Sequence, residues 1–292
     1  MPISESQLQT WSNQGAVVSA KLTHESIRNA LAAYNWSSGI TYDTYLQGSY
    51  RNSTNIRGDS DVDLVVELTS VFYSNLSERE KSKLGITPAA YGWSEFRQEV
   101  INALSSYYGS QYVDKSGSKS IKLLPNSGRL KADVVVAVKY KHYENMRLVA
   151  EGMTFWTLSG SHQIYNFPKL HYENGTNKNS QQQTKGLYKP NVRVFKNARN
   201  RIIETNTLLS GRFPSYFIEC LLFNVPNSKF STSYQSTFVN SINWLNTQLY
   251  NDGWQGFLCQ NKMNYLFGNS TVQWNVIDAR EYVSRLVAMW NN

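Results

Sequence analysis

Residues 46–68 read LQGSYRNSTNIRGDSDVDLVVEL, and this stretch decides the fold. Polar and apolar residues alternate from Asp61 onward, which predicts a strand at 61–68 that follows a shorter strand at 42–47. Successive side chains of a strand point to opposite faces, so Asp61 and Asp63 share one face. The other face carries the apolar side chains expected in a core, namely Val62, Leu64 and Val66.

Carboxylates on one strand face repel each other unless a positive charge lies between them. Magnesium, held by one or two carboxylates together with substrate phosphates, is the usual solution. A solvated strand face is the alternative that Asp61 and Asp63 alone leave open. Asp133 adds weight to the metal site, because it interrupts an apolar strand predicted at 129–140. A buried carboxylate needs a partner or a metal, and a strand end beside the other two would supply one.

Gly48 and Ser49 end the first predicted strand, with Ser49 standing 12 residues before Asp61. Glycine lets a backbone approach a phosphate closely, and the following amides and the Ser49 hydroxyl can donate to phosphate oxygens. A Gly-Ser pair carries little information alone. Combined with Asp-x-Asp at this spacing and a later strand Asp, it predicts a site for phosphoryl transfer.

This combination of Gly48-Ser49, Asp61-Val62-Asp63 and Asp133 resembles the nucleotidyltransferases of the polymerase-beta-like superfamily. More narrowly, the chain is similar to the bacterial CD-NTases, which are relatives of animal cyclic GMP–AMP synthase and of oligoadenylate synthase. The resemblance covers most of residues 40–225. It implies an α+β fold, with a nucleotidyltransferase lobe of mixed sheet and helices, a C-terminal all-helical lobe, and an active site in the cleft between them.

The resemblance also implies a mechanism. Asp61, Asp63 and Asp133 would hold two Mg²⁺ ions, for which Mn²⁺ can substitute, and Asp133 would help to deprotonate the acceptor ribose hydroxyl. Nucleoside triphosphates would be joined into a cyclic di- or trinucleotide messenger with release of pyrophosphate, as in CBASS anti-phage signalling. The product would act on a separate downstream effector. A transferase that modifies RNA ends or a protein, and an inactive RNA-binding relative, are the alternatives.

Positive charge is concentrated in the second half of the chain. Residues 166–212 hold nine basic and two acidic side chains, and so carry +7 of the net charge of +8. Within a predicted helix at 189–206, Arg193 and Lys196 lie on one polar face with Asn200. We expect this face to bind the donor triphosphate, although a solvated helix face is the alternative.

Five further residues are candidates for nucleotide contacts. By resemblance, Ser215 would bind phosphate and Tyr216 would stack on a base, with a core tyrosine as the alternative. Asn166 could read a uracil edge through its amide, as in some relatives, or cap the next turn. Arg51 and Lys169 are candidates for contacts with the acceptor nucleotide.

The organisation of the chain follows from these segments. We expect a catalytic lobe with bridging N-terminal helices at 1–165 and a helical lobe at 166–292, and within the latter a loop or a mobile helix start at 174–186. The composition, 41% apolar and 13% aromatic, excludes general disorder, and the chain has no apolar run long enough for a membrane span. Two cysteines favour a cytoplasmic protein, and the four histidines show no zinc spacing. We expect a monomer, and the outlying Lys178, Lys185 and Lys189 could bind an activating RNA.

Overall fold

The computed structural model describes residues 2–15, 17–58, 61–159, 162–270 and 272–291. Contacts divide the chain into two compact units. One, called here the sheet unit, comprises residues 16–50 and 60–168. The other, the helical unit, is assembled from residues 1–15, 51–59 and 169–292. Its first two pieces come from the part of the sequence that precedes most of the sheet.

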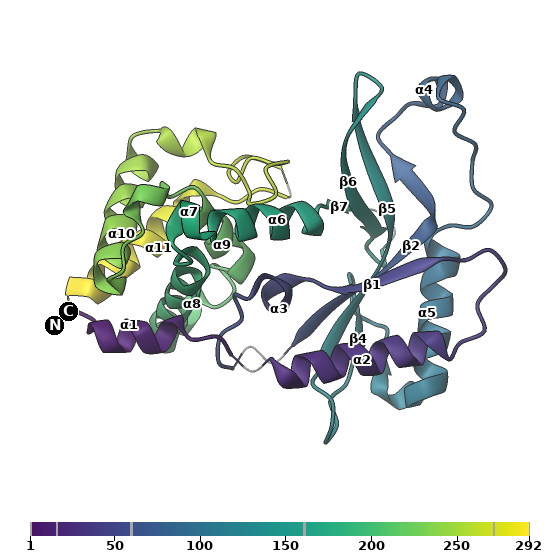
Figure 1. Cartoon of the computed structure of the whole chain (residues 1–292), viewed down its shortest axis with the longest axis horizontal. Helices are drawn as coiled ribbons and strands as arrows, with labels where there is room; N and C mark the ends of the chain where they lie inside the picture. The colour runs from purple at the N-terminus through teal and green to yellow at the C-terminus, as the bar shows by residue number, and fades with distance from the viewer. Residues whose placement is uncertain (1, 16, 59–60, 160–161, 271, 292) are drawn as a thin grey trace. The chain divides into compact units, whose positions relative to one another are not determined.

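The sheet unit is built on a mixed seven-stranded sheet (Figure 1). Its two long central strands, β2 (Val62–Ser74) and β5 (Ala132–Glu144), run parallel to each other, and the other pairings are antiparallel. The outer strands are β1 (Tyr42–Leu46), β3 (Val113–Asp114), β4 (Ile121–Leu123), β6 (Arg147–Trp156) and β7 (Gln163–Asn166). The predicted strands at 42–47, 61–68 and 129–140 are confirmed, whereas β7 was not predicted.

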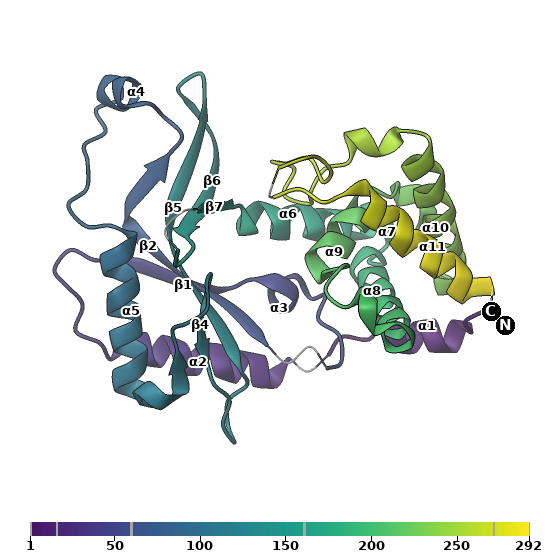
Figure 2. The ribbon, with the colours of Figure 1, turned by 180° about the vertical axis from the view of Figure 1, so that it is seen from behind.

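Helices α2 (Val18–Ala32) and α5 (Trp93–Tyr108) cover one face of this sheet. Their apolar sides, which include Ile27, Leu31 and Phe96, pack with Val62 and Leu64 of β2 in a single core cluster. The short helix α4 (Glu78–Lys83) follows the end of β2, and α3 (Gly48–Asn52) follows β1. Figure 2 shows the same elements from behind. The predicted core face of β2 is confirmed, because Val62, Leu64 and Val66 are fully buried.

The helical unit contains α1 (Glu5–Ser12), α8 (Tyr188–Thr205), α9 (Ser215–Phe223), α10 (Tyr234–Tyr250) and α11 (Val276–Asn291) around one apolar core. Helix α1 lies beside α8 and α10. Two more helices, α6 (Pro168–Lys178) and α7 (Gln181–Thr184), precede α8. Cys220 is part of this core.

Of the two alternatives predicted for 174–186, a loop or a mobile helix start, the loop is wrong, because the structure has α6 and α7 over most of this segment. The uncharged-polar composition of this segment does not indicate a helix, because the helix is stabilised by contacts with other segments of the chain. Asn174 Nδ2 donates to the Gln260 carbonyl over 2.9 Å, and the Gln260 side chain occupies the space where a side chain at Gly175 would lie. A helix of low intrinsic propensity is stable when packing supplies what propensity does not.

No helix within the described ranges is both long and apolar enough to cross a membrane.

Candidate active site

Asp63 and Asp133 are neighbours on the two central strands. In the parallel register of β2 and β5 they stand directly opposite each other, followed on the same face by Val65 and Val135. This face is the one opposite to α2 and α5. The structure therefore brings together two of the three carboxylates that the sequence singled out, on a sheet face that α2 and α5 do not cover.

Asp61 has a different partner. Its Oδ2 lies 2.5 Å from Lys131 Nζ, and both side chains remain more than one-third exposed. The hydrogen bond to Asp61 raises the pKa of Lys131, with further help from the charges of Asp61 and Asp133. Within the part of the chain that the structure describes, no three His, Cys, Asp or Glu side chains are gathered tightly enough to hold a metal as they stand. Asp61 would have to leave Lys131 to join the other two carboxylates.

The local chemistry nevertheless fits a divalent cation. Asp133 Oδ1 is buried and has no hydrogen-bond partner among the described residues, so one carboxylate oxygen is available to a ligand. Carboxylate oxygens are the ligands that Mg²⁺ takes in proteins. The residues that are present can therefore bind such an ion through Asp63 and Asp133.

Gly48 is fitted closely against Asp63. Its φ of +64° lies in the left-handed region, and a Cβ at this position would overlap the Asp63 carboxylate. The amide of Gln47 also donates to the Asp63 carbonyl over 2.9 Å. The turn predicted to bind phosphate thus abuts the carboxylate predicted to bind metal, with Ser49 as the next residue of α3.

Arg193 and Lys196 are buried further than their polar helix face suggested. Lys196 is fully buried, and its Nζ donates to the Thr54 carbonyl over 2.9 Å. Arg193 donates to the Ser12 carbonyl over 2.5 Å and also to the Ser53 carbonyl. Burial lowers the pKa of Arg193. Both cations therefore hold backbone carbonyls of other chain segments, and their predicted contact with a triphosphate stays a prediction.

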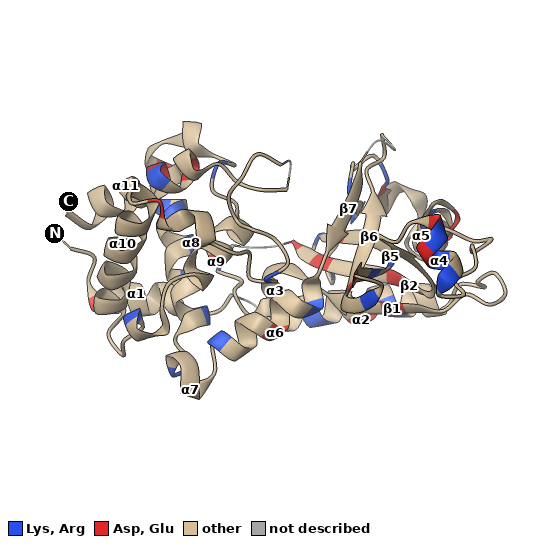
Figure 3. Cartoon of the chain, turned by 90° about the horizontal axis from the view of Figure 1, so that it is seen from above, with Lys and Arg blue, Asp and Glu red and all other residues tan. Residues whose placement is uncertain are grey.

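Other basic residues of the helical unit lie on α6, on α8, in the segment between them and on α11 (Figure 3). Lys178 is not the outlying lysine that was predicted to bind RNA. Its Nζ donates to the Val225 carbonyl and to Asn227 Oδ1, over 2.8 and 3.0 Å, among three aromatic rings. Burial lowers the pKa of Lys178 to about 8. Lys189 donates to Thr176 Oγ1 over 3.2 Å, and Lys185 is exposed.

Ser215 and Tyr216 open helix α9. Tyr216 is 39% exposed and stacks on His171 and Trp274, with ring centroids 5.0 and 5.5 Å away. Burial of the hydroxyl raises the pKa of Tyr216. Tyr216 is therefore not a core tyrosine, because part of its ring is exposed while the ring also packs against two other aromatic side chains. Its stacking on a base stays a prediction.

The remaining predicted residues are accessible. Asn166 is exposed and is the last residue of β7, opposite Met153 of β6. Arg51 lies over the ring of Tyr172 at 4.4 Å. Lys169 is exposed in the first turn of α6.

Sequence reasoning missed Glu219, a carboxylate of α9 that is only 4% exposed. Burial alone would raise its pKa, but His171, Lys196 and a hydrogen bond from Thr54 hold the pKa of Glu219 below its usual value. The signal was the same as for Asp133, since a single acid interrupts the apolar run FIECLLF.

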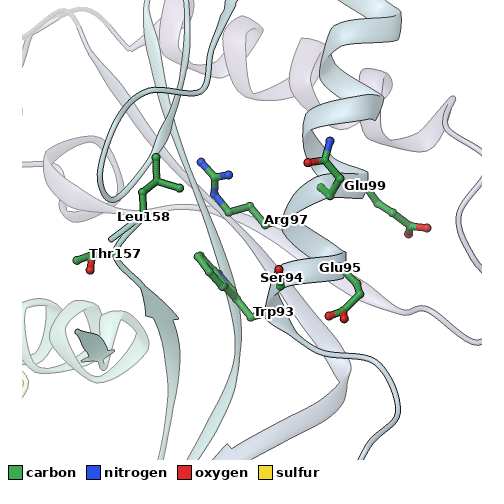
Figure 4. A pocket seen from close by; sticks show the side chains of 8 residues that line it. Trp93, Ser94, Glu95, Arg97, Glu99, Thr157 and Leu158 are labelled. Atoms are coloured by element: carbon green, nitrogen blue, oxygen red, sulfur yellow. The ribbon is translucent and has the colours of Figure 1, made fainter. Parts of the chain in front are cut away.

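A hollow of about 740 Å³ lies elsewhere in the sheet unit, at the start of α5. Trp93 and Arg97 project from that helix toward Thr157 and Leu158 (Figure 4). None of the predicted site residues lines it. Its lining has no group of carboxylates on one strand face, so we do not assign the reaction to it.

The chain is similar to known proteins over almost its whole length. The model for the C-terminal helical domain of cGAS/DncV-like nucleotidyltransferases matches residues 173–291. The chain is 47% identical to the cyclic UMP-AMP synthase of Rhodothermus marinus, over 99% of this chain and 98% of that protein. It is 33% identical to the cyclic dipurine nucleotide synthase of Elizabethkingia meningoseptica, over 92% of each.

Solved structures give the same result. The Rhodothermus marinus CdnE c-UMP-AMP synthase, solved with Apcpp and Upnpp, matches with a TM-score of 0.91 and 46% identity, over 99% of this chain and 97% of that one. The Elizabethkingia meningoseptica CdnE synthase, solved with GTP and Apcpp, matches with a TM-score of 0.79 and 30% identity, over 97% of each chain. The predicted α+β fold with a helical C-terminal domain is thereby confirmed. This chain belongs to the CD-NTase family of cGAS/DncV-like nucleotidyltransferases and is a CdnE-type cyclic dinucleotide synthase.

Proposed function

We propose that this synthase joins one uridine and one adenosine nucleotide into cyclic UMP-AMP. The observation that carries the proposal is Asn166, which presents a side-chain amide at the exposed end of β7. A side-chain amide presents an N–H donor beside a carbonyl acceptor, the pattern that complements the edge of uracil. The Rhodothermus marinus relative, 47% identical and named for the same product, supports this choice.

The carboxylates of β2 and β5 carry the chemistry in this proposal. Asp61, Asp63 and Asp133 would hold divalent cations, Mg²⁺ or Mn²⁺, which would neutralise charge on the transferring phosphate. Asp133, with a buried oxygen that lacks a hydrogen-bond partner in the described structure, accepts the proton of the acceptor ribose hydroxyl. The hydroxyl oxygen then forms its bond to the α-phosphorus of the donor, and the bond to pyrophosphate breaks. A second, equivalent transfer closes the ring.

The other residues bind and orient the two nucleotides. The amides after Gly48 and the Ser49 hydroxyl donate to phosphate oxygens, as Ser215 does from the first turn of α9. Tyr216 offers the exposed part of its ring to a base. Arg193 and Lys196 add positive charge for the triphosphate, and Arg51 and Lys169 contact the acceptor nucleotide.

The experiment is a set of pairwise incubations of the four nucleoside triphosphates with Mg²⁺ or Mn²⁺, followed by mass spectrometry. We expect a phosphatase-resistant product with the mass of cyclic UMP-AMP from the UTP and ATP pair. A product formed only from purine nucleotides would refute the assignment of uridine. A lengthened RNA or a labelled protein, without a cyclic product, would indicate a transferase of another kind. The variant Asp133→Asn, which keeps the shape of the side chain, should lower the rate by about 10³-fold or more.

We further propose that the product is a messenger in CBASS anti-phage signalling and acts on a separate effector protein. The resemblance to CD-NTases supports this role. Cytoplasmic location, action as a monomer, and lobe limits at 1–165 and 166–292 stay predictions. So does activation by RNA, for which Lys185 and Lys189 are the remaining candidates among the three lysines.

A further inference from the structure

The buried acid Glu219 connects three segments that are far apart in the sequence. Its Oε1 lies 3.0 Å from His171 Nε2 and accepts from Gln260 Nε2 over 3.3 Å. Its Oε2 accepts from the Thr54 hydroxyl over 3.1 Å. A buried charge satisfied in this way does not by itself add stability, and its effect is to favour one geometry of its partners.

Thr54 is held from two sides. Its side chain, fully buried, donates to Glu219, and its carbonyl accepts from Lys196 over 2.9 Å. We call the set of Thr54, Glu219 and Lys196 the Thr54 clamp. The preceding residue, Ser53, has a φ of +56°, and its carbonyl accepts from Arg193. A non-glycine residue with this φ persists only where its surroundings fix it.

The clamp lies immediately after the turn that we propose to bind phosphate. Helix α3 begins at Gly48, contains Ser49 and ends at Asn52, two residues before Thr54. Its first residue is fixed by the close approach of Gly48 to Asp63. A helix of five residues has little stability of its own, so its direction depends on what holds each end.

We propose that Glu219 is a positioning residue for the reaction: through the hydroxyl of Thr54 it fixes the far end of α3 and so the place of Ser49. The proposal rests on the phosphate-binding role of Gly48 and Ser49 proposed above. Glu219 touches neither nucleotide in this scheme. Loss of its contact with Thr54 should therefore weaken binding of triphosphate and leave the acid–base step at Asp133 unchanged.

The test compares two fully buried threonines of the helical unit. Thr54→Val removes the hydroxyl that reaches Glu219. Thr237→Val removes a hydroxyl that donates to the Ser231 carbonyl over 3.0 Å, on a helix that has no predicted site residue. Both variants exchange a buried hydroxyl for a methyl group, but Thr54 loses a hydrogen bond to a carboxylate whereas Thr237 loses hydrogen bonds to backbone groups, so Thr54→Val should lose more stability. Initial rates of pyrophosphate release are measured against triphosphate concentration, together with thermal unfolding.

We expect Thr54→Val to raise KM about tenfold, with kcat changed by less than about threefold. Thr237→Val should leave KM and kcat within about twofold of the wild-type values while it also lowers Tm. Thr54→Ser restores the hydroxyl and should return KM to within about threefold of the wild-type value. Thr54→Ala is made alongside, since its smaller side chain keeps the test open if the valine variant does not fold.

The proposal is overturned if KM of Thr54→Val, or of Thr54→Ala, matches that of Thr237→Val. It is equally overturned if Thr54→Ser binds triphosphate no better than Thr54→Val. Failure of the wild-type protein to form cyclic UMP-AMP would count against the proposed product instead. The kinetic comparison still applies in that event, because pyrophosphate release reports on any pair of nucleotides that the enzyme joins.

Discussion

Replacing Gly48 by alanine should disable the synthase while leaving it folded. Two costs are expected from the structure. The first is backbone strain, about 1–2 kcal/mol for a residue with a side chain in the left-handed region, because Gly48 has a φ of +64°. The second is a collision, since the new Cβ would lie 3.1 Å from Asp63 Cγ and closer still to its Oδ2. Either the α3 turn or the Asp63 carboxylate must move.

The displacement matters more than the strain. A shift of about 1 Å in a reacting group can cost about 10²-fold in rate. We therefore expect Gly48→Ala to lower the rate of pyrophosphate release by about that factor, with a decrease in Tm of only a few degrees.

Gly39→Ala is the matched control. Gly39 also has a positive φ, +80°, in the same unit, but no atom lies within 4 Å of the Cβ that it would gain. Gly39→Ala should show a loss of Tm no larger than that of Gly48→Ala, with activity unchanged. The assays are initial rates at saturating triphosphate and thermal unfolding of both variants. Activity of Gly48→Ala within about threefold of Gly39→Ala would refute the reasoning, because strain alone would then account for both.

Three further predictions concern stability and base choice. The pKa of Lys178 is lowered to about 8, so between pH 8 and about 10.5 the unfolded chain binds a proton that the folded chain has lost, and stability must rise with pH. The free energy of unfolding of the wild-type protein, relative to that of Lys178→Met, should increase by about 2 kcal/mol between pH 7.5 and about 9.5 in denaturant unfolding. A difference between the two proteins that does not change with pH would contradict the lowered pKa of Lys178. Gly152→Ala places a Cβ closer than 3.0 Å to the Asn166 carbonyl and should lower the share of uridine in the product by mass spectrometry; an unchanged share in a folded variant would remove Asn166 from base choice. Glu5 accepts from two backbone amides at the start of α10, over 2.6 and 2.8 Å, so Glu5→Ala should lower the free energy of unfolding by about 1–3 kcal/mol, and no change would show that α1 does not support α10.

The strands that carry the carboxylates were predictable because their pattern is local. Alternation placed Asp63 on the face opposite Val62, and the apolar run around Asp133 indicated a buried strand. That these two acids would stand opposite each other depends on the register of two strands about 70 residues apart, which the family pattern supplied. The pairing of Asp61 with Lys131 cannot be predicted from the sequence of either strand alone.

The polar interior of the helical unit was not predictable from single elements. Arg193 and Lys196 follow the pattern of a solvated helix face, yet their partners are carbonyls of residues 12, 53 and 54, from 140 to 181 residues earlier in the chain. The helix at 168–178 was missed for the same physical reason. Its support comes from Gln260, not from its own composition.

The position of peptide 51–59 in the sequence affects the order in which the chain can fold during synthesis. During synthesis this peptide emerges before most of the sheet unit exists. Glu219 and Lys196, the acceptor and the donor that hold Thr54, are synthesised more than 140 residues later. A ribosome-bound chain can therefore complete the sheet early, since domains fold as units while synthesis proceeds. The turn at Ser49 gains its second support only when α9 has been released. A chain truncated before α9 would have the strands that carry the carboxylates, but its phosphate-binding turn would lack the contact with Glu219. We therefore expect such truncated chains to have no synthase activity.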